Sequence, residues 1–310
     1  MHVRSIGNHE LPAASCGLKI KQVVITAAGI GTRLLTVTKE QPKEMLPLFD
    51  RRQNSGLYVK PILQMIFEHL YRFGFRDFCF IVGRGKRVIE DHFTIDRDFL
   101  KQLSSKGKHE QLSCLEQFYQ MIEDSTIVWI NQPEPKGFGH AVLMAQPFLR
   151  NEPFLVHAGD TLILSNTGSF LERLLSAHQK EKVAATLLVK EVENPKIYGV
   201  AEVQGREGEI FAVKKVIEKP FRPQTNLAIM PIYVFDPAII PVLKNLKPGK
   251  SGEIQLTDGI QEMLSKGNKV QAIRLGEDEA RLDVGTPETY WEAVRVSHEY
   301  SKEKLKNNCV

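Results

Sequence analysis

Cysteine is scarce in the sequence, and its few copies are spread too far apart to act together. The four cysteines of this 310-residue chain are Cys16, Cys79, Cys114 and Cys309, and no two of them form a Cys-x-x-Cys pair. A zinc ribbon and a thioredoxin-like redox motif both need such a pair, so the spacing excludes them. We expect a reduced protein of the cytoplasm.

Long apolar runs are also missing, and neither sign of charge dominates. No window approaches 18 uninterrupted apolar residues, the length that a membrane helix needs, and residues 1–20 lack the apolar segment of a secretory leader. The 41 lysines and arginines exceed the 37 acidic residues by only four, a net charge of +4. We therefore expect no membrane span and no nucleic-acid partner, whereas a mildly basic surface suits small anionic substrates.

What the sequence does contain is a regular alternation of strand and helix patterns over its first 190 or so residues. Apolar, β-branched runs predict buried strands at 21–27, 77–83, 126–132, 153–160 and 183–192. Helical spacing of apolar residues predicts helices at 61–74, 96–123 and 168–182. This alternation indicates an α/β, Rossmann-like fold with a mainly parallel sheet covered by helices on both faces.

Between residues 198 and 235 the pattern changes to short strands without intervening helices. The runs YGVAEV, IFAVKKVIEK and LAIMPIYVF predict a small antiparallel or mixed β insertion beside the main sheet. Helices are expected again at 237–246 and 254–266, with further strands in VQAIRLG and ARLDVG. A closing helix at 286–305 has Thr286 as its N-cap and a proline in its first turn.

A glycine turn directly follows the first predicted strand. Gly29 and Gly31 would let the backbone approach a ligand closely and direct its N–H groups toward it. The turn lacks the Walker pattern, and Leu34 occupies the third glycine position of the dinucleotide fingerprint. Arg33 and Lys43 place two cations near the turn instead, which suits a polyphosphate. On spacing alone, a structural turn and a phosphate site are equally good interpretations.

The whole segment 27–47, AAGIGTRLLTVTKEQPKEMLP, strongly resembles the nucleotide-binding opening of the sugar-1-phosphate nucleotidyltransferases. Within that family, residues 41–45 (QPKEM) favour the uridylyl branch over the thymidylyl and adenylyl branches. Further segments match the family in chain order: Gln132 with 136–141, 157–160, 198–200 with 218–220, 252–258 and 282–287. The resemblance spans roughly residues 20–300.

The resemblance implies a domain organisation for the chain. Residues 1–20 are expected to be an irregular extension, 21–305 a single nucleotidyltransferase domain, and 306–310 a tail. The domain would consist of a nucleotide-binding half at about 21–165, a sugar-binding half at about 166–285 and the closing helix. A homo-oligomer, either a dimer or a tetramer, is expected as well.

The reaction that the resemblance implies joins a nucleoside triphosphate to a sugar 1-phosphate. UTP and glucose 1-phosphate would give UDP-glucose and pyrophosphate, by in-line attack of the sugar phosphate on the α-phosphorus. No covalent protein nucleophile is needed, in agreement with the lack of a Ser-His-Asp or Cys-His arrangement. The alternatives are the same reaction with dTTP or another hexose 1-phosphate, and a non-catalytic nucleotide-sugar sensor.

The resemblance also assigns roles to individual residues. Arg33 and Lys43 would hold the triphosphate, and Lys219 the sugar phosphate, as the catalytic cations. Asp160 and Asp283 would hold Mg²⁺ through oxygen ligands. The expected substrate contacts are Ala27, Ala28, Gly29, Gly31, Thr32, Glu44, Gln132, Gly137, Gly199, Glu218 and Lys219. Within this set Gln132 can offer a donor and an acceptor to the uracil edge, and Glu218 would accept hydrogen bonds from the sugar hydroxyls.

Some features of the sequence are given no role in the reaction, and others depart from the pattern of the family. His140 and His157 are interpreted as structural histidines, and 84–87 (RGKR) as a solvated loop that leads into a helix. Residues 51–56 lengthen the loop before the first helix. Thr36 occupies a position where the family usually has proline, and 229–233 (IMPIY) replaces a usual Gly-Arg-Tyr continuation. The last departure lies near the expected sugar pocket and leaves the identity of the sugar open.

Overall fold

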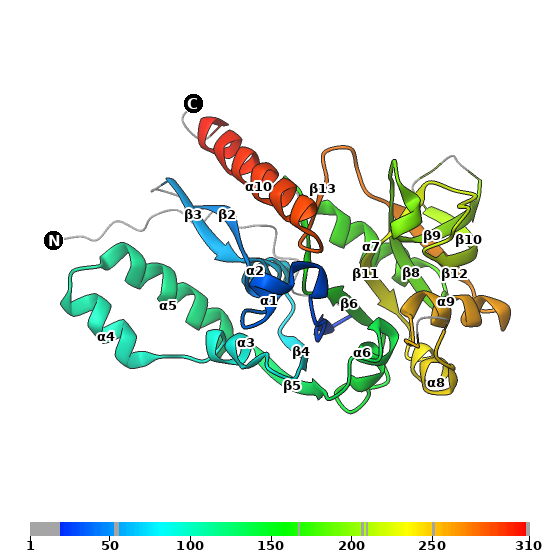
Figure 1. Cartoon of the computed structure of the whole chain (residues 1–310), viewed down its shortest axis with the longest axis horizontal. Coiled ribbons are helices and arrows are strands. Elements are labelled where there is room, and N and C mark those ends of the chain that lie inside the picture. Colours follow the sequence, from blue (N-terminus) through cyan, green and yellow to red (C-terminus); the bar gives the residue numbers. More distant parts are fainter. Residues whose placement is uncertain are drawn as a thin grey trace.

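The computed structural model describes residues 19–52, 56–166, 168–205, 208, 210–249 and 252–307. A nine-stranded sheet runs through the middle of this part of the chain, and helices pack on both of its faces (Figure 1). The expected N-terminal extension lies outside the described residues up to 18, and the expected tail lies outside them from 308 on. Within the described part, no helix is both long and apolar enough to cross a membrane.

The strands of the large sheet lie in the order β5-β4-β1-β6-β11-β8-β12-β10-β9. Their bounds are β5 Thr126–Gln132, β4 Asp77–Gly83, β1 Gln22–Ala27, β6 Phe154–Ala158, β11 Leu227–Phe235, β8 Ala185–Glu191, β12 Val270–Arg274, β10 Ile210–Glu218 and β9 Gly199–Gln204. Strands β5, β4, β1 and β6 are parallel to one another. Strand β11 is antiparallel to both β6 and β8, and β10 is antiparallel to β12 and β9.

This strand order corrects two expectations. The sheet is mixed rather than mainly parallel, because β11, β10 and β9 run against their neighbours. The strands of 198–235 also do not form an insertion beside the main sheet, since β11 lies at its centre while β10 and β9 extend it. Strand β9 pairs with β11 as well, through Val200 and Ala228, so this end of the sheet curls back on itself.

Alternate residues of strand β1 belong to two separate hydrophobic cores. Val23 packs in one core with helices α2 (Ile62–Phe73) and α7 (Ser169–Lys180). Val24 packs in the other, which contains α6 (Phe138–Met144), α8 (Ile239–Asn245) and α9 (Leu256–Ser265). Successive strand residues point to opposite faces, so an uninterrupted apolar strand must be covered on both sides. The prediction of helices on both faces of the sheet is therefore confirmed.

The helices follow the predictions except where a glycine interrupts the chain. Helix α2 begins after Pro61 and ends at Gly74, whose φ of 118° is left-handed. The single helix expected at 96–123 is instead two, because Gly107 turns the chain with a φ of 65°. These are α4 Arg97–Ser105 and α5 His109–Glu123, and the others are α1 Leu35–Thr38, α3 Arg87–His92 and α10 Pro287–Asn307.

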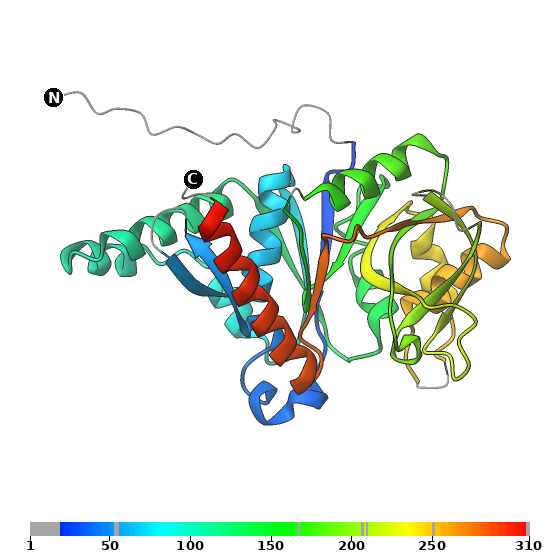
Figure 2. The same ribbon diagram turned by 90° about the horizontal axis from the view of Figure 1, so that it is seen from above.

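Of residues 51–56, expected as a lengthened loop, Arg51, Arg52 and Gly56 belong to strands of a β-hairpin, and 53–55 lie outside the described residues. Strand β2 (Pro47–Arg52) pairs with β3 (Gly56–Pro61), and helix α10 lies along the hairpin (Figures 1 and 2). Ser297 Oγ of α10 accepts a hydrogen bond from Phe49 N at 3.2 Å, and Tyr290 Oη donates to the carbonyl of Pro47 at 3.2 Å. The closing helix therefore anchors strand β2, which begins shortly after the turn that carries Lys43.

Candidate active site

A cleft of about 540 Å³ lies where β1, β5 and β6 end, the place where ligands of open α/β sheets bind. The predicted site residues that line it are Ala28, Gly29, Gly31, Thr32, Arg33, Lys43, Glu44, Gln132, Gly137, Asp160, Gly199, Glu218, Lys219 and Asp283. Ala27 does not line the cleft, because its side chain is buried in the core beside β1. A larger hollow of about 1220 Å³ beside the β2–β3 hairpin contains none of these residues.

The glycine turn after β1 forms one wall of the cleft. Gly31 has a φ of 72°, a left-handed conformation that disfavours any residue with a Cβ. Its carbonyl accepts a hydrogen bond from Thr38 Oγ1 at 2.8 Å, which closes the short helical turn that carries Arg33. A Cβ added at Gly29 would approach Cε of Lys43 to 3.5 Å. The turn therefore brings the two cations expected at the triphosphate into one cleft.

Lys43 and Asp160 form an ion pair in this cleft, with a hydrogen bond from Lys43 Nζ to Asp160 Oδ2. Burial alone would lower the pKa of Lys43, but nearby carboxylates, Asp160 foremost, outweigh burial and leave that pKa raised. Burial likewise acts to raise the pKa of Asp160, but Lys43 and Arg281 outweigh it and keep that pKa below its ordinary value. Both side chains are therefore charged at neutral pH.

Asp160 and Asp283 come from distant parts of the sequence and are brought together by a short strand pair. Strand β13 (Ala280–Asp283) runs antiparallel to β7 (Thr161–Leu164), with Asp283 opposite the first residue of β7. The backbone N–H of Val284 donates to the carbonyl of Asp160 at 3.0 Å. This pairing places both expected metal ligands at the same edge of the cleft.

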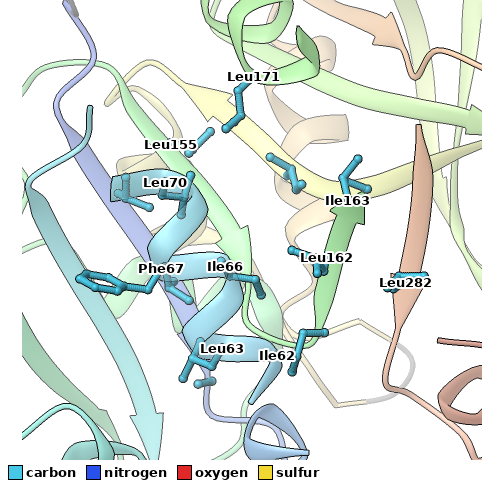
Figure 3. Close-up of a cluster of buried hydrophobic side chains, with 14 of the residues drawn as sticks. Ile62, Leu63, Ile66, Phe67, Leu70, Leu155, Leu162, Ile163, Leu171 and Leu282 are labelled. Carbon is cyan, nitrogen blue, oxygen red and sulfur yellow. The ribbon is translucent and has the colours of Figure 1, made fainter. Parts of the chain in front are cut away.

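A buried apolar cluster holds that strand pair in place (Figure 3). Leu282 of β13 lies opposite Leu162 of β7, and both share a core with the apolar face of α2. Each fully buried leucine contributes roughly 1.5–3 kcal/mol. Because Leu282 directly precedes Asp283, and Leu162 follows two residues after Asp160, the core fixes the backbone that carries both carboxylates.

Two carboxylates suit a hard divalent cation but do not enclose one. Among the residues that the structure describes, no group of three or more His, Cys, Asp or Glu side chains is placed to hold a metal ion. Mg²⁺ is usually bound by one or two carboxylates, with phosphate oxygens and waters completing its octahedron. Asp160 and Asp283 fit this donor set, in which the substrate supplies the remaining ligands.

Arg281 is a charged residue of the cleft that the sequence motifs did not reveal. Its guanidinium donates to Asp283 Oδ1 at 2.7 Å and lies over the Tyr198 ring at 5.0 Å from its centroid. The side chain is only 14% exposed, and its buried Nε has no hydrogen-bond partner among the described residues. Side chains two residues apart on a strand point to the same face. The two-residue spacing of Arg281 and Asp283 on a predicted strand was therefore the sequence signal that could have linked them.

The basic segment 84–87 is a turn that leads into helix α3, as predicted, and Arg84, Gly85 and Arg87 are exposed, but Lys86 departs from the prediction. Lys86 is buried, and its Nζ donates to Glu44 Oε2 at 2.6 Å. Burial raises the pKa of Glu44, while Lys86 and Lys43 partly offset that increase. Sequence composition could not show this, because the carboxylate that neutralises Lys86 stands 42 residues earlier. The Glu44 side chain thus connects Lys43 to the rigid strand β4 and helix α3.

The part of the cleft expected to hold the sugar contains a backbone outlier. Lys219 has a φ of 40°, one of the few non-glycine residues in the described part with a positive φ. Its Nζ lies 3.2 Å from Glu218 Oε1, and Glu218 Oε2 accepts from Thr257 Oγ1 at 2.8 Å. A Cβ at Gly199 would come within 3.0 Å of Thr257 Oγ1 and 3.1 Å of Glu218 Oε2. Glycine at 199 therefore leaves the room that these polar groups occupy.

Gln132 at the end of β5 and His157 near the end of β6 are both held by hydrogen bonds within the protein. Gln132 donates from Nε2 to the Gly137 carbonyl at 3.2 Å and to His140 Nδ1 at 2.8 Å. Both amide N–H groups are thus engaged by protein acceptors in this structure, and a donor contact from Gln132 to a base stays a prediction. His157 is buried and its Nδ1 bonds the Ala158 carbonyl at 2.8 Å. Burial lowers the pKa of His157 to about 4, so it is neutral, in agreement with a structural role.

Comparison with known proteins agrees with this geometry. A model of the nucleotidyl transferase family matches residues 22–299, so the chain belongs to that family. Nucleotidyl transferases of this kind generally use a divalent metal.

Its similarity to particular members is high over most of its length. It is 37% identical over 272 residues to the UTP–glucose-1-phosphate uridylyltransferase of Bacillus subtilis (strain 168), covering 86% of this chain and 87% of that protein. A UTP–glucose-1-phosphate uridylyltransferase of Staphylococcus epidermidis is 38% identical over 252 residues, which cover 80% of this chain and 83% of that protein. The crystal structure of a UDP-glucose pyrophosphorylase complexed with UDP-glucose superposes with a TM-score of 0.77 at 31% identity. The match covers 92% of this chain and 99% of that one.

Proposed function

We propose that this chain joins UTP and glucose 1-phosphate to form UDP-glucose and pyrophosphate. The observation that carries the proposal is the gathering, in one cleft, of cations and paired carboxylates from both halves of the chain. The names of the uridylyltransferase relatives at 37–38% identity support these two substrates.

In the proposed reaction an oxygen of the sugar phosphate forms a bond to the α-phosphorus of UTP. The bond from that phosphorus to the bridging oxygen of the β-phosphate breaks, and its electron pair leaves with pyrophosphate. Two anions must meet for this, so positioning and charge neutralisation provide most of the catalysis. We assign the triphosphate to Arg33 and Lys43, and the sugar phosphate to Lys219. Lys43 would move its flexible ammonium from Asp160 to a phosphate oxygen.

The metal in this proposal is Mg²⁺, held by Asp160 and Asp283. When bound, it would neutralise charge on the phosphates and on the departing pyrophosphate. Arg281 donates to Asp283 and lies close enough to Asp160 to lower the pKa of that carboxyl. We infer that Arg281 orients both carboxylates toward the cleft.

Pyrophosphate release tests the proposed function directly. UTP, dTTP, ATP, CTP and GTP are each combined with several hexose 1-phosphates in the presence of Mg²⁺. The highest kcat/KM is expected for UTP with glucose 1-phosphate. If nucleotide binds but no pair releases pyrophosphate, the protein is a sensor rather than an enzyme.

A second candidate is the same reaction with a different hexose 1-phosphate. Ile229 and Pro231 line the cleft at the positions where the family usually continues toward Gly-Arg-Tyr. An arginine near the sugar would add charge and hydrogen bonds that these apolar side chains cannot supply. A higher kcat/KM with a sugar other than glucose, in the same assay, would favour this candidate.

Two substitutions at Lys219 separate its charge from its backbone conformation. Lys219→Ala and Lys219→Gly both remove the ammonium, so the KM for glucose 1-phosphate is expected to rise roughly tenfold to a hundredfold. The glycine variant should be the more stable by about 1 kcal/mol, because a left-handed backbone costs a residue with a Cβ about that much. Steady-state kinetics and urea unfolding measure the two effects.

The matched control for these variants is Lys215→Ala, an exposed lysine on strand β10, which ends directly before Lys219. It should change neither the KM nor the unfolding free energy by a measurable amount. An unchanged KM in both Lys219 variants would exclude a role in binding the sugar phosphate. Equal stabilities of the alanine and glycine variants would exclude the strained backbone.

A further inference from the structure

The orientation of the Gln132 side-chain amide is fixed by two neighbours. The carbonyl of Gly137 can only accept a hydrogen bond, so the amide nitrogen of Gln132, at 3.2 Å, must face it. The same nitrogen lies 2.8 Å from His140 Nδ1. His140 Nδ1 must therefore be an acceptor, which requires a neutral imidazole with its proton on Nε2.

The surroundings of both residues favour this arrangement. Gln132 is only 4% exposed, and it is one of the residues that line the cleft. Partial burial of His140 and the positive charge of Lys136 lower the pKa of His140, which favours its neutral form, although Glu134 acts in the opposite direction. No described residue donates a hydrogen bond to Gln132 Oε1, so this oxygen is the part of the side chain left for a ligand.

The loop that carries the Gly137 carbonyl is itself rigid. Gly139 N donates to the Ile254 carbonyl at 2.8 Å, and Ile254 N donates to the Lys136 carbonyl at 2.8 Å. Gly137 has a φ of 100°, and a Cβ there would come within 2.7 Å of the Ile254 carbonyl. Both acceptors of the Gln132 amide, the N-cap Gly137 and His140 in the first turn of α6, thus lie on a helix start that is tied to the segment before α9.

We propose that His140 is a positioning residue that makes the site select uracil over cytosine. By accepting from Gln132, it leaves only the carbonyl oxygen of that side chain for the base. Uracil presents an N3–H donor at the centre of its pairing edge, whereas cytosine presents an N3 lone pair. An amide oxygen held toward this edge attracts the N3–H of uracil and repels the N3 lone pair of cytosine. The inference rests on the proposed function in one respect, that a nucleotide occupies this cleft.

Without the His140 acceptor, only the 3.2 Å hydrogen bond to the Gly137 carbonyl opposes a turn of the Gln132 amide, so the amide can turn over at the cost of that one bond. It would then present its N–H to cytosine N3 and its carbonyl oxygen to the cytosine amino group. Discrimination between UTP and CTP is therefore expected to depend on a residue that does not itself touch the base. Loss of one fixed hydrogen bond weakens UTP binding about fivefold to tenfold.

Binding titrations of UTP and CTP, measured by calorimetry, test the inference without requiring turnover. His140→Leu removes the acceptor, and the Kd for UTP should rise about fivefold to tenfold while the Kd for CTP falls. His140→Asn can place an amide oxygen near the position of Nδ1, so it should restore most of the preference for UTP. His109→Leu, the same change on an exposed helix, should leave both Kd values as in the wild type.

The outcomes separate this inference from the proposed function. If His140→Leu folds, as thermal melting will show, and keeps the wild-type ratio of Kd for CTP to Kd for UTP, the inference is overturned. It is also overturned if both Kd values rise equally, because that is the result of a merely structural histidine. Pyrophosphate release by the wild type is a separate readout, and its absence would contradict the proposed function without affecting the binding ratio.

Discussion

Asp160→Asn is expected to lower the kcat of UDP-glucose formation on the order of a thousandfold at millimolar Mg²⁺. Asparagine keeps the shape of the side chain but removes its charge, so the cation loses one of the two carboxylates that fit it. The measurement is pyrophosphate release over a wide range of Mg²⁺ concentrations. Part of the activity should return at high Mg²⁺, because Asp283 remains.

Asp98→Asn is the matched control, since Asp98 pairs with Lys101 on the exposed surface of α4. It should behave as the wild type at every Mg²⁺ concentration. Thermal melting accompanies both variants, because removal of one charge from the partly buried Lys43–Asp160 pair also lowers stability. Wild-type kinetics in Asp160→Asn would show that the metal is held elsewhere.

The part of the site that the sequence predicts is the part set by local pattern. A β-branched run followed by Gly29 and Gly31 predicts a strand and a turn, and an apolar run that ends at Asp160 predicts a strand-end carboxylate. The structure has both features and places them in one cleft. These predictions needed only residues that are close together in the sequence.

The features that sequence patterns miss all depend on partners far apart in the chain. Strand β11 lies between β6 and β8, yet its apolar sequence is equally compatible with a place in a separate sheet. Lys86 is basic and follows a glycine, so it resembles a solvated residue until its bond to Glu44 is seen. Arg281 gains its importance from Tyr198 and Asp283, of which only Asp283 is near in sequence. Pairing across such distances is decided by tertiary packing and not by local preference.

Charge pairing within the cleft explains how so many ionisable groups can share it. Lys43 pairs with Asp160, Arg281 with Asp283, and Lys219 with Glu218. An isolated buried charge would cost several kcal/mol, whereas paired charges are tolerated. A polyanionic substrate and a divalent cation bring charges of both signs, so they can replace these pairs without leaving a buried charge alone.

Lys43→Met is expected to lower kcat/KM for UTP roughly a hundredfold to a thousandfold. Methionine preserves the length of the side chain but cannot neutralise a phosphate. The same change removes the cation that pairs with Asp160, so a divalent cation should bind the nucleotide-free protein more tightly than it binds the wild type. Opposite effects on metal affinity and on turnover are the signature of a lysine that exchanges Asp160 for a phosphate.

Steady-state kinetics with UTP and calorimetric titration with Mg²⁺ measure these two effects. Lys39→Met is the matched control, because Lys39 lies four residues earlier with a side chain that is 76% exposed. It should change neither quantity. If Lys43→Met weakens metal binding and turnover together, Lys43 supports the fold of the carboxylate pair and does not contact the triphosphate. If turnover is unchanged, Arg33 alone neutralises the phosphates, and the assignment of Lys43 is wrong.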